Sequence, residues 1–228
     1  MIILAVDTAG PMCAACLYDG ESDQSFASIS KNIGRGHAEH LPSVIQNVLD
    51  DAKLSFENIT HIAVTIGPGS FAGIRVGIAY CRTLALALDI PATGVSSLNA
   101  ISFGVSQALN KDTLTLLDAR RGEVYLSALD ASGATILEPQ AMSYEDALLK
   151  ISDKQFVVCG NGVEPVVKLS EDEISDLEIV HENAFPEIET VARLALNQIK
   201  DSITHELRPQ YLRQADAKPN ENFALDRA

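Results

Sequence analysis

Residues 2–7, Ile-Ile-Leu-Ala-Val-Asp, open the chain with an apolar run that ends on an aspartate, and residues 113–118, Thr-Leu-Thr-Leu-Leu-Asp, follow the same plan. After each run the chain turns and returns as a second apolar stretch that closes on another aspartate, Asp19 or Asp130. In both copies the two aspartates are twelve positions apart, and the copies are offset by 111 residues in a chain of 228. A unit repeated at half the chain length indicates a duplicated fold.

Both halves continue with patterns that fit an α/β lobe. Apolar side chains at helical or strand spacing predict the remaining elements: a strand at residues 25–29, helices at 40–53 and 71–88 with a strand at 61–66, then a helix near 144–151, strands at 156–159 and 177–180, and a last helix at 188–200. Rossmann and P-loop fingerprints are absent from the sequence. The sequence therefore predicts an α/β protein of two ribonuclease-H-like lobes in the actin-like (ASKHA) duplication, with mixed sheets flanked by helices.

Three segments follow from this plan. We expect an N-terminal lobe over residues 1–104, a C-terminal lobe over residues 105–206 and a polar tail over residues 207–228. The tail loses its periodicity, so we expect partial disorder after about Leu212.

Composition limits the class of protein. The net charge of −14 weighs against direct binding of a nucleic-acid backbone, because such proteins usually carry a basic patch. The start of the chain has no basic segment before its apolar run, and no run approaches the roughly 20 apolar residues of a membrane span, so we expect a cytoplasmic protein. Four cysteines suit a reducing compartment, and a strand through Cys13 and Cys16 predicts buried thiols on opposite faces.

A long motif connects the chain with a known family. Residues 67–77, GPGSFAGIRVG, resemble the GPGSFTGLRIG stretch of the TsaB family, with Ala72 in place of threonine and Val76 in place of isoleucine. Further matches cover nearly the whole chain: ILAVDT at residues 3–8, HAE at 37–39, SSL at 96–98, DARRGEVY at 118–125 and PQYLR at 209–213. The chain is therefore similar to TsaB proteins from end to end.

The resemblance implies a function. It implies a non-catalytic subunit that binds and activates a TsaD-like transferase and assembles with a TsaE-like ATPase, in forming threonylcarbamoyladenosine on transfer RNAs that read codons beginning with A. It further implies a homodimer when the chain is alone, contact with tRNA only through the complex, and no membrane. No cofactor is expected, and a nucleotide would bind only at the interface of the complex.

The resemblance also implies where partners bind. In the family, the surface of the first two helices meets TsaD or another copy of TsaB. The interface residues expected here, all in the N-terminal lobe, are Leu41, Val44, Ile45, Val48, Gly73, Gly77 and Tyr80. The alternative is that these residues cover the sheet of their own lobe, as the apolar face of a helix usually does.

A second set of residues could bind an anion or a nucleotide. It combines a glycine-rich turn before a helix, two aspartates at strand ends and two arginines in a turn: Gly67, Gly69, Ser70, Asp7, Asp118, Arg120 and Arg121. Each part also has a structural interpretation. The glycines permit a tight turn and close helix packing, the aspartates can cap their own turns, and the arginines can pair with Glu123.

Two other functions remain as alternatives. An actin-like phosphotransferase would use Asp7, residues 67–70 and Asp118 to bind ATP. An M22-type metalloprotease homologue would need two histidines four residues apart on a helix, whereas His37 and His40 are three apart and precede the predicted helix. We therefore predict no catalytic and no metal-binding residues, and we expect His37 to form a hydrogen bond at the helix entry.

Overall fold

The computed structural model describes residues 1–152, 156–170, 177–180, 184–203 and 205–213. The elements of the first half are β1 (Ile2–Asp7), β2 (Met12–Asp19), β3 (Gln24–Asn32), α1 (His37–Ala52), η1 (Phe56–Asn58), β4 (His61–Gly67), α2 (Phe71–Leu88), β5 (Ala92–Ser96) and α3 (Ser97–Leu109). The elements of the second half are β6 (Thr113–Arg120), β7 (Glu123–Leu129), β8 (Thr135–Ser143), α4 (Tyr144–Ser152), β9 (Val157–Cys159), α5 (Val163–Val167), β10 (Ile179–Val180) and α6 (Ile188–Lys200).

The two halves form sheets of the same topology. The first sheet has the order β3-β2-β1-β4-β5, and the second has the order β10-β9-β6-β7-β8, in which β6 takes the place of β1. In each sheet the central strand is antiparallel to the strand that follows it and parallel to the strand after the next helix. This shared topology confirms the predicted duplication of a mixed, ribonuclease-H-like sheet flanked by helices.

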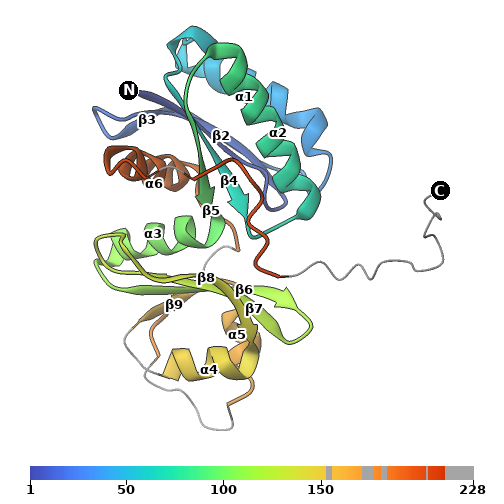
Figure 1. The fold of residues 1–228 in the computed structure, drawn as a ribbon, viewed down its shortest axis with the longest axis vertical. Coiled ribbons are helices and arrows are strands. Elements are labelled where there is room, and N and C mark those ends of the chain that lie inside the picture. Colours follow the sequence, from blue (N-terminus) through green and yellow to red (C-terminus); the bar gives the residue numbers. More distant parts are fainter. Residues whose placement is uncertain (153–155, 171–176, 181–183, 204, 214–228) are drawn as a thin grey trace, which may run out of the picture.

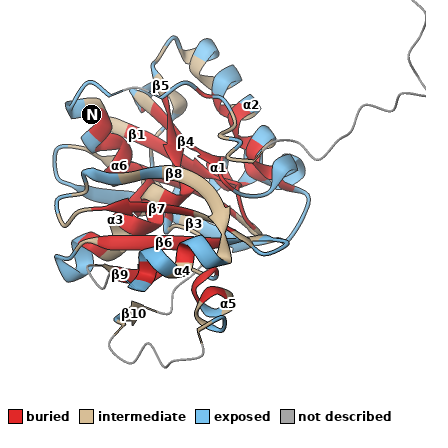
Figure 2. Cartoon of the chain, turned by 60° about the horizontal axis from the view of Figure 1, so that its bottom comes forward, coloured by how far each residue is buried: buried red, intermediate tan, exposed pale blue. Residues whose placement is uncertain are grey.

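Successive side chains of β1 point to opposite faces of the first sheet, and each face packs against different helices. Leu4 and Val6 belong to the core beneath α1 and α2, whereas Ile3 and Ala5 belong to a second core with α6. The molecule is therefore layered, with α1 and α2 outside the first sheet, α6 and α3 between the sheets, and α4 and α5 outside the second sheet (Figure 1). Figure 2 shows β1, β4 and β6 buried along most of their length.

The two inner helices are exchanged between the halves. Helix α6, from the second half, packs on β1 and β2, and the Cys16 thiol lies 3.6 Å from the Ile188 carbonyl oxygen. Helix α3, from the first half, packs on β6 and β7, where the hydroxyl groups of Ser102 and Thr115 are 2.7 Å apart. Each lobe thus completes its core with a helix that the other half of the sequence supplies.

The exchange changes the expected domain boundaries. The division between residues 104 and 105 falls inside α3, and α6, expected in the C-terminal lobe, covers the sheet of the first lobe. The expected tail also begins inside the fold, because Leu207 packs in the core with α1 and α2 and the Gln210 amide donates to the Ile66 carbonyl at 2.8 Å. The disorder predicted after about Leu212 concerns residues that, beyond Arg213, lie outside the described part of the chain.

The predicted helices agree well with the structure at two places. Helices α2 and α6 have the predicted bounds, and the Ser70 hydroxyl accepts a hydrogen bond from the Gly73 amide as an N-cap should. Helix α1 begins at His37 rather than at residue 40. Strands β5 and β8 and helices α3 and α5 were not predicted.

Candidate partner face and interlobe cleft

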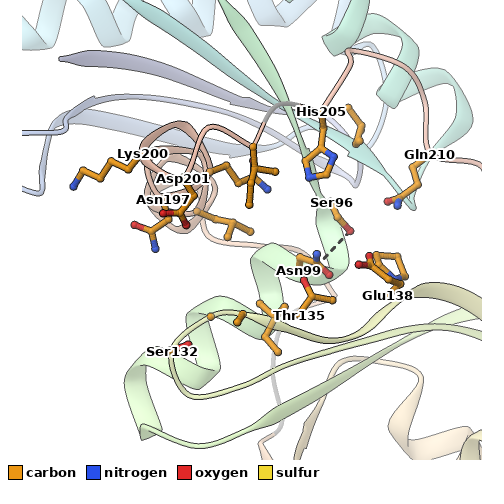
Figure 3. A pocket seen from close by; sticks show the side chains of 18 residues that line it. Ser96, Asn99, Ser132, Thr135, Glu138, Asn197, Lys200, Asp201, His205 and Gln210 are labelled. Atoms are coloured by element: carbon orange, nitrogen blue, oxygen red, sulfur yellow. Dashed lines mark hydrogen bonds between the residues drawn. The ribbon is translucent and has the colours of Figure 1, made fainter.

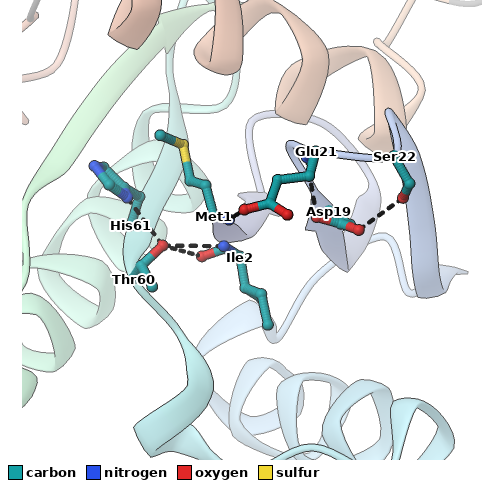
Figure 4. Close-up of polar contacts among 7 residues, drawn as sticks. All are labelled: Met1, Ile2, Asp19, Glu21, Ser22, Thr60 and His61. Carbon is teal, nitrogen blue, oxygen red and sulfur yellow. Dashed lines mark hydrogen bonds and ion pairs between the residues drawn. The ribbon is translucent and has the colours of Figure 1, made fainter.

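The four aspartates of the sequence repeat occupy equivalent turns. In each turn a carboxylate oxygen accepts a hydrogen bond from the amide two residues later: Asp7 from Ala9 at 2.9 Å, Asp19 from Glu21 at 3.0 Å, Asp118 from Arg120 at 2.7 Å and Asp130 from Ser132 at 2.8 Å. Figure 4 shows this arrangement at Asp19, where the Ser22 hydroxyl donates to the second oxygen. The interpretation of the strand-end aspartates as caps of their own turns is therefore confirmed.

Asp7 differs from the other three by its burial. Its side chain is almost fully enclosed, it accepts a 2.5 Å hydrogen bond from the Thr65 hydroxyl, and its Oδ2 atom is without a partner. Burial raises the pKa of this carboxyl above its ordinary value of 3.8, although the hydrogen bonds from Thr65 and Ala9 and the nearby His37 oppose the shift. The ionised form of Asp7 therefore costs stability in the folded protein.

We expect Asp7→Asn to be at least as stable as the unchanged chain at pH 7. Because the folded pKa lies above the unfolded one, the unchanged protein gains stability as pH falls through the raised pKa, and the variant lacks this gain. Urea unfolding between pH 5 and 8 measures the difference. Asp130→Asn is the matched control with the opposite sign, because hydrogen bonds from Ser132 and Ala134 lower the pKa of Asp130. A large loss of stability in Asp7→Asn at pH 7 would contradict this expectation, because it would show that the ionised carboxylate of Asp7 stabilises the fold.

The backbone around the glycine-rich turn is occupied by the chain itself. The Ser70 amide donates to the Ala9 carbonyl at 2.6 Å, and the Thr8 hydroxyl donates to the Gly73 carbonyl at 2.8 Å. A Cβ atom would lie 2.2 Å from the Ala9 oxygen at Gly69 and 2.0 Å from the Thr8 oxygen at Gly73. The β1–β2 turn thus fills the space beside the start of α2, which supports the packing interpretation of these glycines.

Part of the predicted anion set lines one cleft between the lobes. We call the space between Pro68–Ser70 and Asp118–Arg120 the turn cleft; it has a volume of about 520 Å³. Gly69, Ser70, Asp118 and Arg120 line this cleft, whereas Asp7, Gly67 and Arg121 do not.

The carboxylate of the turn cleft, that of Asp118, already has partners within the chain, whereas the buried Ser97 hydroxyl on the same wall has none. One oxygen of Asp118 also accepts a 2.9 Å hydrogen bond from the Tyr144 hydroxyl, and Glu123 forms an ion pair with Arg213 at 3.3 Å. The cleft therefore holds one guanidinium group, that of Arg120, beside a hydrogen-bonded carboxylate, a weak combination for binding phosphate.

The residues expected at the partner interface do not lie at the surface. Leu41, Val44, Ile45 and Val48 are at most 1% exposed and pack on the first sheet, so their selection as contact residues is corrected by the structure. Gly73 and Gly77 are also buried, and the space above them is taken by Thr8. Only Tyr80 of the set is half-buried and can contact another protein. A stripe of apolar residues on α1 reflects the core of the lobe.

The exposed side of α2 offers an apolar surface instead. We define the α2 outer face by residues that follow one another at helical spacing on the exposed side, namely Ala72, Val76, Ala79, Thr83 and Leu86; of these, Val76 is half-buried and also packs against the core. Leu86 is 84% exposed, and only 28% of the residues of α2 are buried. Among the described residues, α2 is the one helix long and apolar enough by length and composition alone to cross a membrane, a property that core helices of soluble proteins share. Arg75 and Arg82 lie among its exposed residues.

An exposed aromatic cluster lies at the start of this helix and was not predicted. The Arg75 guanidinium lies 3.7 Å above the centre of the Phe71 ring and donates to the Tyr211 hydroxyl at 2.9 Å. The two rings stack with centres 5.7 Å apart, and both are more than half exposed. The separation of 136 positions between Arg75 and Tyr211 hides the cluster from sequence reasoning.

Histidine and cysteine side chains have local structural roles. The His37 Nε2 atom is 3.1 Å from the Met12 carbonyl oxygen, which confirms a hydrogen bond at the entry of α1. Cys13 and Cys16 are buried in different cores on opposite faces of the first sheet, and burial raises the pKa of Cys13 to about 11. Within the described ranges, no three His, Cys, Asp or Glu side chains gather as metal ligands would.

Comparisons with known proteins agree with this fold. The profile of the family described as "TsaD: tRNA N6-adenosine threonylcarbamoyltransferase" matches residues 28–221. A protein of Bacillus subtilis strain 168 named "tRNA threonylcarbamoyladenosine biosynthesis protein TsaB" is 27% identical over 226 residues, which cover 96% of either chain. The protein of the same name from Escherichia coli K12 is 35% identical over 127 residues, covering 55% of this chain and 53% of the relative.

A solved structure extends the agreement to three dimensions. The crystal structure of "an uncharacterized protein with similarity to peptidase YEAZ" from Pseudomonas aeruginosa superimposes with a TM-score of 0.78 at 24% identity. The superposition covers 93% of this chain and 99% of the other, so the two proteins share the whole two-lobed fold. Because the family profile covers most of the chain, the chain belongs to the TsaD-type family and, with the relatives named TsaB, to its TsaB (YeaZ) branch.

Proposed function

We propose that the protein is a non-catalytic subunit of the cytoplasmic machinery that forms threonylcarbamoyladenosine on transfer RNA. In this proposal it binds and activates a TsaD-like transferase through the α2 outer face and assembles with a TsaE-like ATPase. It contacts tRNA only through the complex, and alone it pairs with a second copy through the same face.

The observation that carries the proposal is the α2 outer face. Soluble proteins rarely leave an apolar helix this exposed unless another surface covers it. Its residues are small or apolar, and the exposed Arg75 and Arg82 lie beside it, as charged residues do at the rim of a protein interface. Small side chains also allow another helix to approach closely. A helix of a related partner is therefore a suitable occupant.

The turn cleft supports an accessory role over an independent phosphotransferase. The Ser70 amide is bonded to the Ala9 carbonyl, and Thr8 and Ala9 fill the space beside Gly69 and Gly73. A phosphate group at this turn would have to displace the β1–β2 turn. A nucleotide would then bind only where the complex supplies further groups. Tight binding of ATP to the isolated chain would favour the phosphotransferase instead.

Reconstitution tests the proposal directly. The chain is mixed with the TsaD-like and TsaE-like proteins of the same organism, complexes are measured by light scattering, and tRNA modification is assayed with each component omitted in turn. We expect a mixed dimer with the TsaD-like protein and no modification when either chain is missing. Modification that proceeds without this chain would reject the proposal.

A matched pair of leucines tests the surface itself. Leu86→Glu on α2 should weaken the mixed dimer on the order of 10- to 100-fold, because a charge would be buried in an apolar contact. Leu149→Glu on α4 is the control, since Leu149 is 72% exposed on the far lobe, and it should leave the affinity unchanged. Isothermal titration calorimetry measures both. Equal affinities for the two variants would place the partner elsewhere.

A further inference from the structure

A second cleft lies between the lobes, apart from the turn cleft and the α2 outer face. It is bounded by the C-terminal half of α6, the first turn of α3, the β7–β8 turn and the residues Ile203, His205 and Gln210, and it has a volume of about 530 Å³. We call it the amide cleft. Figure 3 shows Asn99, Glu138, His205 and Gln210 gathered around one part of the cleft, with Lys200 and Asp201 at another. Its volume falls in the range of small-molecule sites.

Three carboxamide oxygens in this cleft are buried without a hydrogen-bond partner. They are Oδ1 of Asn99, Oε1 of Gln198 and Oε1 of Gln210. Gln198 is only 8% exposed, so its amide cannot be satisfied by bulk solvent. A buried acceptor without a partner costs free energy, and such groups are rare in folded proteins. Three of them on the wall of one cavity point to a molecule that donates hydrogen bonds there.

Backbone hydrogen bonds fix the main chain at two of these three residues. The backbone amide of Asn99 donates to the Ser96 hydroxyl at 3.4 Å, in the N-cap of α3. The backbone amide of Gln210 donates to the Ile66 carbonyl of the first lobe. Gln198 belongs to the third turn of α6. The three side-chain carboxamides therefore come from three separate elements that meet only in the folded chain.

The chemistry of the walls selects the class of ligand. Carboxamides both accept and donate hydrogen bonds, so they match hydroxyl groups and carry no net charge. At the rim, Lys200 and His205 are opposed by Glu138 and Asp201, and no arginine is found among the described residues that line the cleft, which disfavours a phosphate group. Phe, Tyr and Trp are also absent from its described lining, so a nucleobase would lack a stacking surface. We infer that the amide cleft binds a small, neutral, hydroxyl-rich molecule of the sugar or polyol class.

Binding of three probes tests this inference on the full chain. D-ribose, myo-inositol and sorbitol are titrated separately, and binding is followed by saturation-transfer NMR and by the shift in melting temperature. The test variant is Gln198→Met, which keeps the volume and removes the buried amide. Gln46→Met is the matched control, because Gln46 is an exposed glutamine on α1. Asn99→Leu is a second test variant at a less buried position.

We expect at least one probe to bind the unchanged chain and Gln46→Met equally, and to bind Gln198→Met and Asn99→Leu at least tenfold more weakly. Ribose 5-phosphate should bind no more tightly than ribose. The inference fails if no probe binds, which would leave the amides to ordered water alone. It also fails if both test variants bind as well as the control, or if the phosphate ester binds much more tightly than the sugar.

Discussion

Gly73→Ala should lower the free energy of unfolding by about 3 kcal/mol, or prevent folding, because the new methyl group would meet the backbone of another element. A Cβ atom at this position lies 2.0 Å from the Thr8 carbonyl oxygen, and that oxygen belongs to the turn between β1 and β2. Backbone cannot rotate aside as a flexible side chain can, so α2 would have to shift as a whole. Urea unfolding followed by circular dichroism measures the change.

Gly104→Ala is the control for this substitution. Gly104 lies inside α3, and the nearest atoms to its Cβ position are those of the Thr190 side chain at 3.4 Å or more, an ordinary contact. Alanine is favoured over glycine inside a helix by roughly 0.5–1 kcal/mol, so this variant should be unchanged or more stable. Equal stability of the two variants would contradict the close packing of Thr8 against α2.

A chain that ends at Pro186 should lose its cooperative unfolding transition. It retains both sheets and lacks α6, which covers the inner face of the first sheet with Val191, Ala195 and Leu196. Exposing that face leaves the buried side chains of β1 and β2 in water, a loss that exceeds the usual stability of a domain. Differential scanning calorimetry and near-ultraviolet circular dichroism would report the missing transition.

A chain that ends at Arg213 serves as the comparison. It keeps α6 and the segment that carries Leu207 and Gln210, and it removes only residues outside the described part. We expect it to unfold like the full chain. A cooperative transition in the chain that ends at Pro186 would mean that the first lobe folds without α6.

The duplicated plan of the fold could be predicted from the sequence because its signal is local. Each copy has an apolar strand, an aspartate, a turn and a returning strand, and the spacing alone aligns the halves. The structure explains this spacing. At the end of each strand an aspartate accepts a hydrogen bond from the amide two residues later in the turn, at Asp7, Asp19, Asp118 and Asp130.

Helix α3 could not be predicted in the same way. Its sequence, SLNAISFGVSQAL, contains three serines, an asparagine and a glycine, which are poor helix formers. Ser102 and Ser106 are nevertheless fully buried, and their hydroxyl groups bond to Thr115 and to the Phe103 carbonyl. Packing between the two sheets stabilises this helix, and no local pattern reports that environment.

The interface residues show a second limit of pattern reasoning. Apolar spacing on α1 and α2 identifies a buried stripe, but it does not tell whether the lobe or a partner covers it. On α1 the stripe belongs to the core, whereas on α2 apolar residues occur on both sides and the outer ones remain exposed. The amide cleft was missed for a related reason, because Asn99 is far in sequence from Gln198 and Gln210, and the three residues share no motif.

The exchange of α3 and α6 has a consequence for how the protein is made. The ribosome releases β1 and β2 first, yet the helix that covers their inner face is encoded in residues 188–200. Domains usually fold in the order of their synthesis, but here the first lobe cannot finish its core until nearly the whole chain has emerged. The nascent chain therefore carries an uncovered face of the first sheet through most of translation, and the first lobe completes its folding only after α6 leaves the exit tunnel.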